Sequence, residues 1–410
     1  MRSLPFSPGF SSRDIGVDLG TANTVVSARG GELVVSEPSV VAADARTGEP
    51  FAAGDEAVDL LGHEEITAIR PLKDGVIADL QAAEALLRHL IGRMRRHGRP
   101  RPRIIAAVPA GVSGVQRRAV AQVCVAAGAR EARLIAKPIA AALGSGLPVE
   151  QPTGSMVLDI GAGTSEVALI SLGAIVASRS IPIGGHELDK RILTHLKREH
   201  RVLIGQQTAE QIKVQIASAS PAGHDAAIEI MGRYLGAESL QTLRLTGQDV
   251  RGALERPLAQ IIEATKETLT DTPPQLACDV IDRGITLTGG GSLLHGLAEQ
   301  LGRETGLPAR PAHSPSTCVA IGASRSVESQ TRRSRPPSPR AMVTMAAGSK
   351  QRPGGNPHSK PDQGMNGPSA PARRLLAAQA ERFPFWPTAA VPAIVARLAD
   401  KAGAAPRPRR

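Results

Sequence analysis

Two short stretches of this chain are nearly alike: Val17-Asp18-Leu19-Gly20-Thr21-Ala22-Asn23-Thr24 and Leu158-Asp159-Ile160-Gly161-Ala162-Gly163-Thr164-Ser165. In each, an apolar run is followed by Asp, one apolar residue, Gly and a cluster of small and hydroxyl residues. The run predicts a buried strand, and the glycines let backbone N–H groups turn toward phosphate oxygens. The Asp can position the water shell of a Mg²⁺ ion. Two well-separated copies predict two facing β-hairpins that hold a phosphate chain.

A third glycine cluster follows a β-branched strand: Leu287-Thr288-Gly289-Gly290-Gly291-Ser292-Leu293-Leu294. We expect it to open a helix over residues 293–304, whose N-terminal amides would add positive potential. Three successive glycines let the backbone lie flat against a base or an α-phosphate. An isolated triglycine is as often an ordinary strand–helix turn. Beside the two hairpins it predicts a further wall of a nucleotide site.

Bulk properties exclude several classes of protein. A chain of 410 residues suggests two or three domains. No apolar run approaches the roughly 20 residues of a membrane-spanning helix, and residues 1–10 lack the apolar region of a secretory signal. Cys124, Cys278 and Cys318 are far apart and odd in number, which predicts buried, reduced thiols in a cytosolic protein, with no disulfide framework and no zinc site.

The net charge of +11 is confined to one end of the chain. Residues 329–410 carry 15 Lys and Arg against three acids, whereas the remainder carries 34 bases and 35 acids. The globular part therefore gives no support to nucleic-acid binding. From residue 327 on, Pro, Gly, Ser and Arg dominate, and we expect residues 327–410 to be disordered.

Residues from about 14 to 328 alternate between strand-like and helix-like patterns, which is typical of an α/β protein. The expected strands are 15–18, 24–28, 104–108, 156–160, 167–170, 175–181 and 285–288. The expected helices are 80–95, 115–127, 138–145, 187–199, 209–216, 250–269 and 293–304. The first of these helices carries an apolar stripe at helical spacing: Leu80, Ala83, Leu86, Leu87, Leu90 and Ile91.

The motifs together resemble a known family. Two phosphate hairpins and a Thr-Gly-Gly-Gly loop resemble the actin/DnaK-type ATPase superfamily, and residues 13–326 resemble its MreB/Mbl-type bacterial actins. The matching runs are Ile15–Thr24, Glu37–Val41, Ala68–Asp79, Glu210–Lys213, Thr272–Pro274 and Asp282–Gly291.

The resemblance implies an actin-like, ribonuclease H-like α/β fold, in which two domains with four subdomains flank an ATP cleft. We expect residues 1–12 to be flexible, residues 13–145 and 146–326 to form the two domains, and residues 327–410 to lie outside them. The resemblance further implies filaments at the inner face of the membrane, in the cytoplasm, that organise cell-wall synthesis and cell shape. Its partners would be the chain itself and cell-wall synthesis proteins.

The resemblance also assigns roles by position. The residues implied to bind ATP are Thr21, Ala22, Asn23, Ala162, Gly163, Thr164, Glu210, Gln211, Ile212, Lys213, Gly290, Gly291, Ser292 and Leu293. Asp18 and Asp159 would hold Mg²⁺ through its waters. Two of these residues have a simpler interpretation, because Lys213 and Glu210 could be a solvated i,i+3 charge pair on a helix.

The sequence departs from the family at the position of a water-orienting residue. Family members carry Glu-Glu-Pro where this chain has Ala136-Lys137-Pro138. A carboxylate can accept a hydrogen bond from the attacking water, whereas Lys has only donors. With Lys137 and Thr164 at the catalytic positions, we expect ATP to be bound but hydrolysed slowly or not at all, with the ammonium paired to the γ-phosphate. Ala162 replaces a family glycine and disfavours a positive φ.

Membrane attachment is predicted from charge. The run from Arg93 to Arg103 is strongly basic and includes Arg95, Arg96 and Arg99. Each Lys or Arg near an anionic surface contributes about 1 kcal/mol, so this loop and the tail could contact an anionic membrane. The aromatic residues Phe383, Phe385 and Trp386 could add apolar insertion. A solvated turn explains the loop equally well.

Three rival functions follow from the same superfamily. A small-molecule kinase would need a general-base Asp within a substrate-binding insertion, and a chaperone ATPase would need a β-sandwich after the ATPase. The sequence shows neither feature. A degenerate, non-polymerising adaptor that recruits partners through its tail stays open as the alternative.

Overall fold

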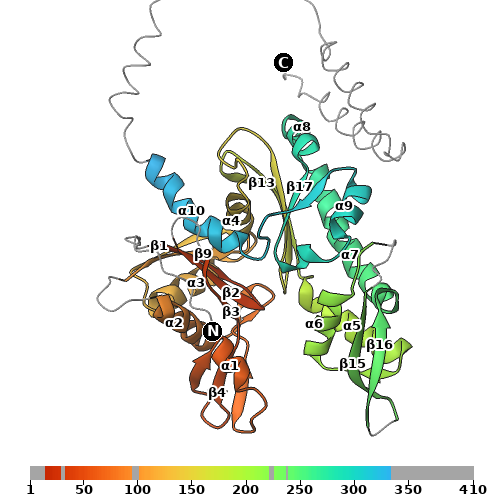
Figure 1. Ribbon diagram of the computed structural model, residues 1–410. Helices are drawn as coiled ribbons and strands as arrows, with labels where there is room; N and C mark the ends of the chain where they lie inside the picture. The colour runs from red at the N-terminus through yellow and green to blue at the C-terminus, as the bar shows by residue number, and fades with distance from the viewer. Residues whose placement is uncertain (1–13, 29–32, 95–100, 221–225, 237–238, 334–410) are drawn as a thin grey trace, which may run out of the picture. The chain divides into compact units, whose positions relative to one another are not determined.

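The computed structural model describes residues 14–28, 33–94, 101–220, 226–236 and 239–333. The chain divides into two units, residues 1–327 and 328–410. The predicted flexible N-terminus 1–12 and most of the predicted tail lie outside the described residues. The site lies within the first unit, which is built from α/β elements (Figure 1).

Two five-stranded sheets share one strand order. The first runs β3(Leu33–Pro38), β2(Asn23–Ala28), β1(Asp14–Leu19), β9(Arg103–Val108), β10(Glu131–Ala136). The second runs β13(Ala174–Ile181), β12(Ser165–Ser171), β11(Ser155–Ile160), β17(Ile285–Thr288), β18(Ala309–Pro311). In both sheets the first three strands pair antiparallel and the last three parallel. The repeat that the sequence shows in two turns therefore extends to whole sheets.

The expected strands and helices are confirmed, with ends that differ by a few residues, except that the helix expected at 293–304 does not begin directly after the triglycine. The helices in the described part of the chain are α1(Asp55–Asp59), α2(Leu80–Met94), α3(Gly114–Ala126), α4(Lys137–Gly144), α5(Gly185–Glu199), α6(Gln206–Gln215), α7(Gly247–Thr270), α8(Pro274–Arg283), α9(Leu297–Thr305) and α10(Cys318–Arg333). Strands β11 and β12 are buried along their whole length, as expected for central strands covered on both faces.

The described residues also form two smaller sheets and a short hairpin. β4(Val41–Asp44) pairs with β5(Pro50–Ala53) and β6(Ile66–Ile69). β15(Ala227–Tyr234) pairs with β14(Val202–Leu203) and β16(Leu240–Thr246). β7(Leu72–Lys73) and β8(Val76–Ile77) form a hairpin of their own. Two large and two small sheets agree with the predicted actin-like, four-subdomain fold.

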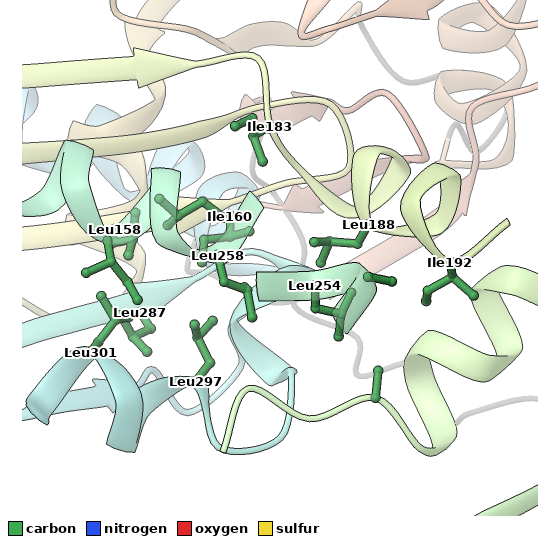
Figure 2. Packing of buried hydrophobic residues seen from close by; sticks show 14 of the residues in the cluster. Leu158, Ile160, Ile183, Leu188, Ile192, Leu254, Leu258, Leu287, Leu297 and Leu301 are labelled. Carbon is green, nitrogen blue, oxygen red and sulfur yellow. The ribbon is translucent and has the colours of Figure 1, made fainter. Parts of the chain in front are cut away.

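The core around the second sheet joins side chains of β11, β17, α5, α7 and α9 (Figure 2). Leu158 and Ile160 of β11 pack with Leu258 of α7 and Leu287 of β17, all at most 3% exposed. This packing fixes the strand that leads into the second predicted phosphate turn.

The core around the first sheet uses the stripe of α2. Ala83, Leu86, Leu87, Leu90 and Ile91 are buried as predicted. Leu80 is 49% exposed, so its inclusion in the stripe was wrong. Leu80 is the first helical residue, where the Asp79 carboxylate accepts a hydrogen bond from the Ala82 amide at 2.9 Å, and Ala82 takes the buried position.

A third cluster joins the two sheets through α4 and α10. Ala140 and Ala141 of α4 lie with Ile105 of β9, Val157 of β11 and Ala323 of α10. These residues share a single apolar cluster, so α4 packs against residues of both five-stranded sheets. Its first residue is Lys137, whose place near both predicted hairpins is set by this packing.

Two predictions about local structure were wrong. The triglycine opens a 3₁₀ turn, η1(Gly290–Leu293), and α9 begins only at Leu297, because His295 forms a bridge with Ser218 and Gly296 adopts a left-handed φ of 72°. Cys278 is exposed, because α8 buries only Ala277 and Val280. Cys124 and Cys318 are buried and free. Within the described ranges, no helix is both long and apolar enough to cross a bilayer.

Candidate functional site

The two predicted hairpins form as paired strands with matching turns. In the first, Leu19 of β1 is the register partner of Thr24 of β2, and in the second, Ile160 of β11 is the partner of Ser165 of β12. The second turn is closed by a 2.9 Å hydrogen bond from the Gly161 amide to the Thr164 carbonyl. Both aspartates therefore lie just before their turns.

Ser39 braces the first turn. Its amide donates to the Ala22 carbonyl at 2.7 Å, and its hydroxyl donates to the Gly20 carbonyl at 2.6 Å. The sequence did not predict this role, although Ser39 lies in the matched run Glu37–Val41. Thr21 is buried within this turn and Asn23 is exposed.

The turn between β7 and β8 brings the two hairpins together. The Gly75 amide donates to Thr21 Oγ1 at 3.1 Å. A Cβ atom at Gly163 would lie 2.9 Å from Thr21 Oγ1 and 2.9 Å from Asp74 Cα. The three turns therefore meet at one point. An Asp-Gly pair is a known turn signal, but the sequence did not indicate which distant turns it contacts.

Ala162 fits the second turn without strain. Among the described residues, positive φ outside glycine occurs only at Asp74, Leu172 and Arg201. The expected penalty at Ala162 is therefore absent. The N-terminus of α5 closes over the turn, because the Gly185 amide donates to the Gly161 carbonyl at 2.9 Å and the His186 amide to the Ala162 carbonyl at 2.8 Å.

The four residues of the predicted run Glu210–Lys213 on helix α6 differ in exposure and in their partners. Lys213 Nζ lies 2.9 Å from Asp189 Oδ1 and donates to the Gly185 carbonyl at 3.3 Å. The interpretation of Lys213 as a solvated charge is therefore wrong. Glu210 and Gln211 are exposed, whereas the Ile212 side chain lies fully in the core and can offer a ligand no side-chain contact.

The triglycine is explained in part by packing. A Cβ atom at Gly291 would clash with the Ile160 side chain, and Gly289 has a φ of 79° close to the Ile160 carbonyl. A Cβ atom at Gly290 would meet nothing within 4 Å. Ser292 is buried and donates to the Gly289 carbonyl at 2.7 Å, and Leu293 is exposed. Gly290 and Leu293 are thus the members open to a ligand.

The two aspartates are held by different partners. Thr288 Oγ1 donates to Asp159 Oδ1 at 2.8 Å. Lys137 Nζ lies 3.2 Å from Asp18 Oδ1. Burial lowers the pKa of Lys137, but the carboxylates of Asp18, Asp159 and Glu166 outweigh it and raise this pKa above its ordinary value. The amine therefore carries its charge at neutral pH.

Glu166 is a site residue that the sequence analysis missed. It is the register partner of Asp159 and is 2% exposed. The Ala110 amide donates to its Oε2 at 3.2 Å. Burial and the neighbouring Asp159 and Asp18 raise its pKa to about 7, although Lys137 acts in the opposite direction. Position 166 could have been found from the antiparallel pairing of a hairpin, which places it opposite Asp159.

The donor set suits a hydrated divalent cation. Glu166 Oε1 is buried and receives no hydrogen bond from the described part of the chain, so a water molecule around a cation could satisfy it. Asp18 Oδ1 faces the Lys137 ammonium. Over the same residues, no three His, Cys, Asp or Glu side chains are placed to ligate a metal directly. The residues therefore fit Mg²⁺ held through its waters.

Comparisons with known proteins agree with this geometry. Cell shape-determining protein MreB of Escherichia coli is 45% identical over 328 residues, which cover 78% of this chain and 94% of that protein. Mbl of Bacillus subtilis is 42% identical over 314 residues, covering 76% and 94%. The crystal structure of Spiroplasma citri MreB5 bound to ADP has a TM-score of 0.73 at 34% identity, covering 78% of this chain and 97% of that one.

The family comparison covers both sheets, both hairpins and the triglycine turn. The sequence pattern of the MreB/Mbl protein family matches residues 12–335. Because that match spans most of the chain and agrees with the two relatives, this chain belongs to the MreB/Mbl family.

Proposed function

We propose that this chain binds ATP between its two hairpins. The observation that carries the proposal is the meeting of the turns at Thr21, Gly163 and Asp74. MreB5 of Spiroplasma citri, 32–34% identical, has been solved with ADP and with AMPPNP. In this proposal the phosphate end of the site is lined by Thr21, Ala22, Asn23, Ala162, Gly163 and Thr164, and Lys213 and Gly290 lie nearer the nucleoside.

Mg²⁺ would be held through water by Asp18 and Asp159. When bound, it would neutralise phosphate charge. The chain's own residues supply the oxygen acceptors, and Thr288 fixes the orientation of Asp159. Calorimetric titration of the purified chain with ADP and Mg²⁺ tests both parts of the proposal. No heat of binding at millimolar nucleotide would contradict it.

The second part of the proposal is that this chain forms filaments that determine cell shape. The relatives at 42–45% identity are named cell shape-determining proteins, and their coverage favours this function over a degenerate adaptor. Electron microscopy of the full chain with ATP and anionic vesicles is the direct test. Protofilaments are expected, whereas particles that stay monomeric would favour the adaptor.

The proposal includes slow hydrolysis of ATP, because residue 137 is a lysine. An ammonium held by Asp18 cannot accept a hydrogen bond from an attacking water. We expect the native chain to turn over ATP more slowly than the variant Lys137→Glu, in phosphate-release assays under filament-forming conditions. Equal rates would contradict this role.

Two of the arginines in the basic run are paired with acidic residues of the chain, so fewer positive charges are left to attach it to a membrane. Arg95, Arg96 and Arg99 lie outside the described residues. The flanking Arg93 pairs with buried Glu37, and Arg103 pairs with Asp14 at 2.8 Å. Co-sedimentation with anionic and neutral vesicles tests the proposal, because binding that ignores lipid charge would contradict an electrostatic anchor.

A further inference from the structure

The buried ammonium of Lys137 lies at the N-terminus of helix α4, where the helix dipole disfavours a positive charge. Lys137 is the first residue of α4, and the N-terminus of a helix carries partial positive charge. Lys137 is also only 8% exposed, so its charge must be compensated by the protein. The compensation comes from Asp18, Asp159 and Glu166, the three carboxylates whose charges act on it most strongly.

The ammonium belongs to the phosphate end of the site. Asp18 precedes the first turn and Asp159 the second, and Glu166 is the register partner of Asp159. Lys137 Nζ lies 3.2 Å from Asp18 Oδ1. An ammonium has three donors on a flexible stem, so it can keep one carboxylate and still donate to a phosphate oxygen.

We propose that the Lys137 ammonium supplies part of the positive charge that Mg²⁺ brings to a bound nucleotide, so that this chain holds adenine nucleotides with a weakened dependence on Mg²⁺. The inference rests on the proposed nucleotide binding. It concerns how tightly the nucleotide is held, not how fast it is hydrolysed.

The charge of residue 137 determines how strongly nucleotide binding should depend on Mg²⁺. With Lys137, one ammonium faces three carboxyl groups. With Glu at this position, a fourth carboxyl group would face an incoming polyphosphate and no cation would offset them. Like charges a few ångströms apart repel strongly where water is excluded, so a pocket with Glu at this position needs a divalent ion to admit the nucleotide. The same ammonium repels a divalent ion and lowers its affinity.

The test is ADP affinity of the full chain measured by calorimetry in Mg²⁺ and in EDTA. We expect removal of Mg²⁺ to weaken binding by less than about tenfold for the native chain and for Lys137→Arg, and by more than about a hundredfold for Lys137→Glu. Lys137→Met removes the charge at similar length and should lie between. Lys197→Glu reverses the charge of an exposed lysine on α5 and should match the native chain.

Each outcome has a separate meaning. Where Lys137→Glu does not fold without ligand, the comparison between the native chain, Lys137→Met and Lys137→Arg decides. Equal Mg²⁺ dependence in the native chain and Lys137→Met overturns the inference. A native chain that binds ADP in Mg²⁺ but loses more than about a hundredfold in EDTA overturns it and leaves nucleotide binding intact. Failure to bind in either buffer overturns the proposed function itself.

Discussion

Gly163 lies directly against Thr21: a Cβ atom at Gly163 would stand 2.9 Å from the Thr21 hydroxyl oxygen. The two residues come from the repeated turns that follow β1 and β11. Asp74 lies against the same glycine, so the contact links three segments that are far apart in the sequence. Its close fit depends on the absence of a side chain at residue 163.

The substitution Gly163→Ala should weaken ADP binding and lower stability by about 1–3 kcal/mol, because the new methyl group would push the turns apart. Calorimetry with ADP and thermal unfolding would measure both effects. Gly92→Ala is the matched control, since a Cβ at Gly92 in α2 meets nothing within 4 Å. If both variants behave alike, close packing at Gly163 does not matter.

Glu166→Gln should flatten the dependence of stability on pH. The pKa of Glu166 is raised from 4.5 to about 7, so its folded form holds a proton that the unfolded chain has lost. The resulting stabilisation, on the order of 3 kcal/mol, is complete below the unfolded pKa and is lost as pH rises through about 7. Urea unfolding between about pH 5 and 8 should therefore show a smaller fall for the variant than for the native chain. Parallel curves would argue against a protonated Glu166.

Lys213→Met should destabilise the protein by about 3 kcal/mol, because Asp189 is buried and would lose its partner. The double variant Lys213→Met/Asp189→Asn should recover part of this loss. Lys190→Met changes an exposed lysine on α5 and serves as the control in the same unfolding experiment. A double variant as unstable as the single one would show that the ion pair is not the cause.

Leu87→Ala should lower the free energy of unfolding by about 2–5 kcal/mol, because Leu87 is fully buried in the first core. Leu80→Ala, on the same helix but half exposed, should cost far less. Denaturant unfolding of the two variants compares a core position with a helix-end position. Similar losses would place Leu80 in the core after all.

The repeated motif allowed the strands, both hairpins and the actin-like fold to be predicted from the sequence. Those features depend on local patterns of burial and turn residues. The meeting of Gly75 with Thr21 and the pair between Lys213 and Asp189 depend on how distant segments pack. Local patterns carry no signal for such contacts, and the helix expected directly after the triglycine was wrong for the same reason.

The lysine at the start of α4 bears on how filaments change with age. In a filament whose subunits hydrolyse ATP soon after assembly, older subunits hold ADP and so differ from newer ones. If Lys137 slows hydrolysis as proposed, a subunit of this chain keeps its nucleotide longer, because an ammonium cannot accept a hydrogen bond from the attacking water. Filaments of this chain would then change mainly through nucleotide exchange or through outside factors that remove subunits.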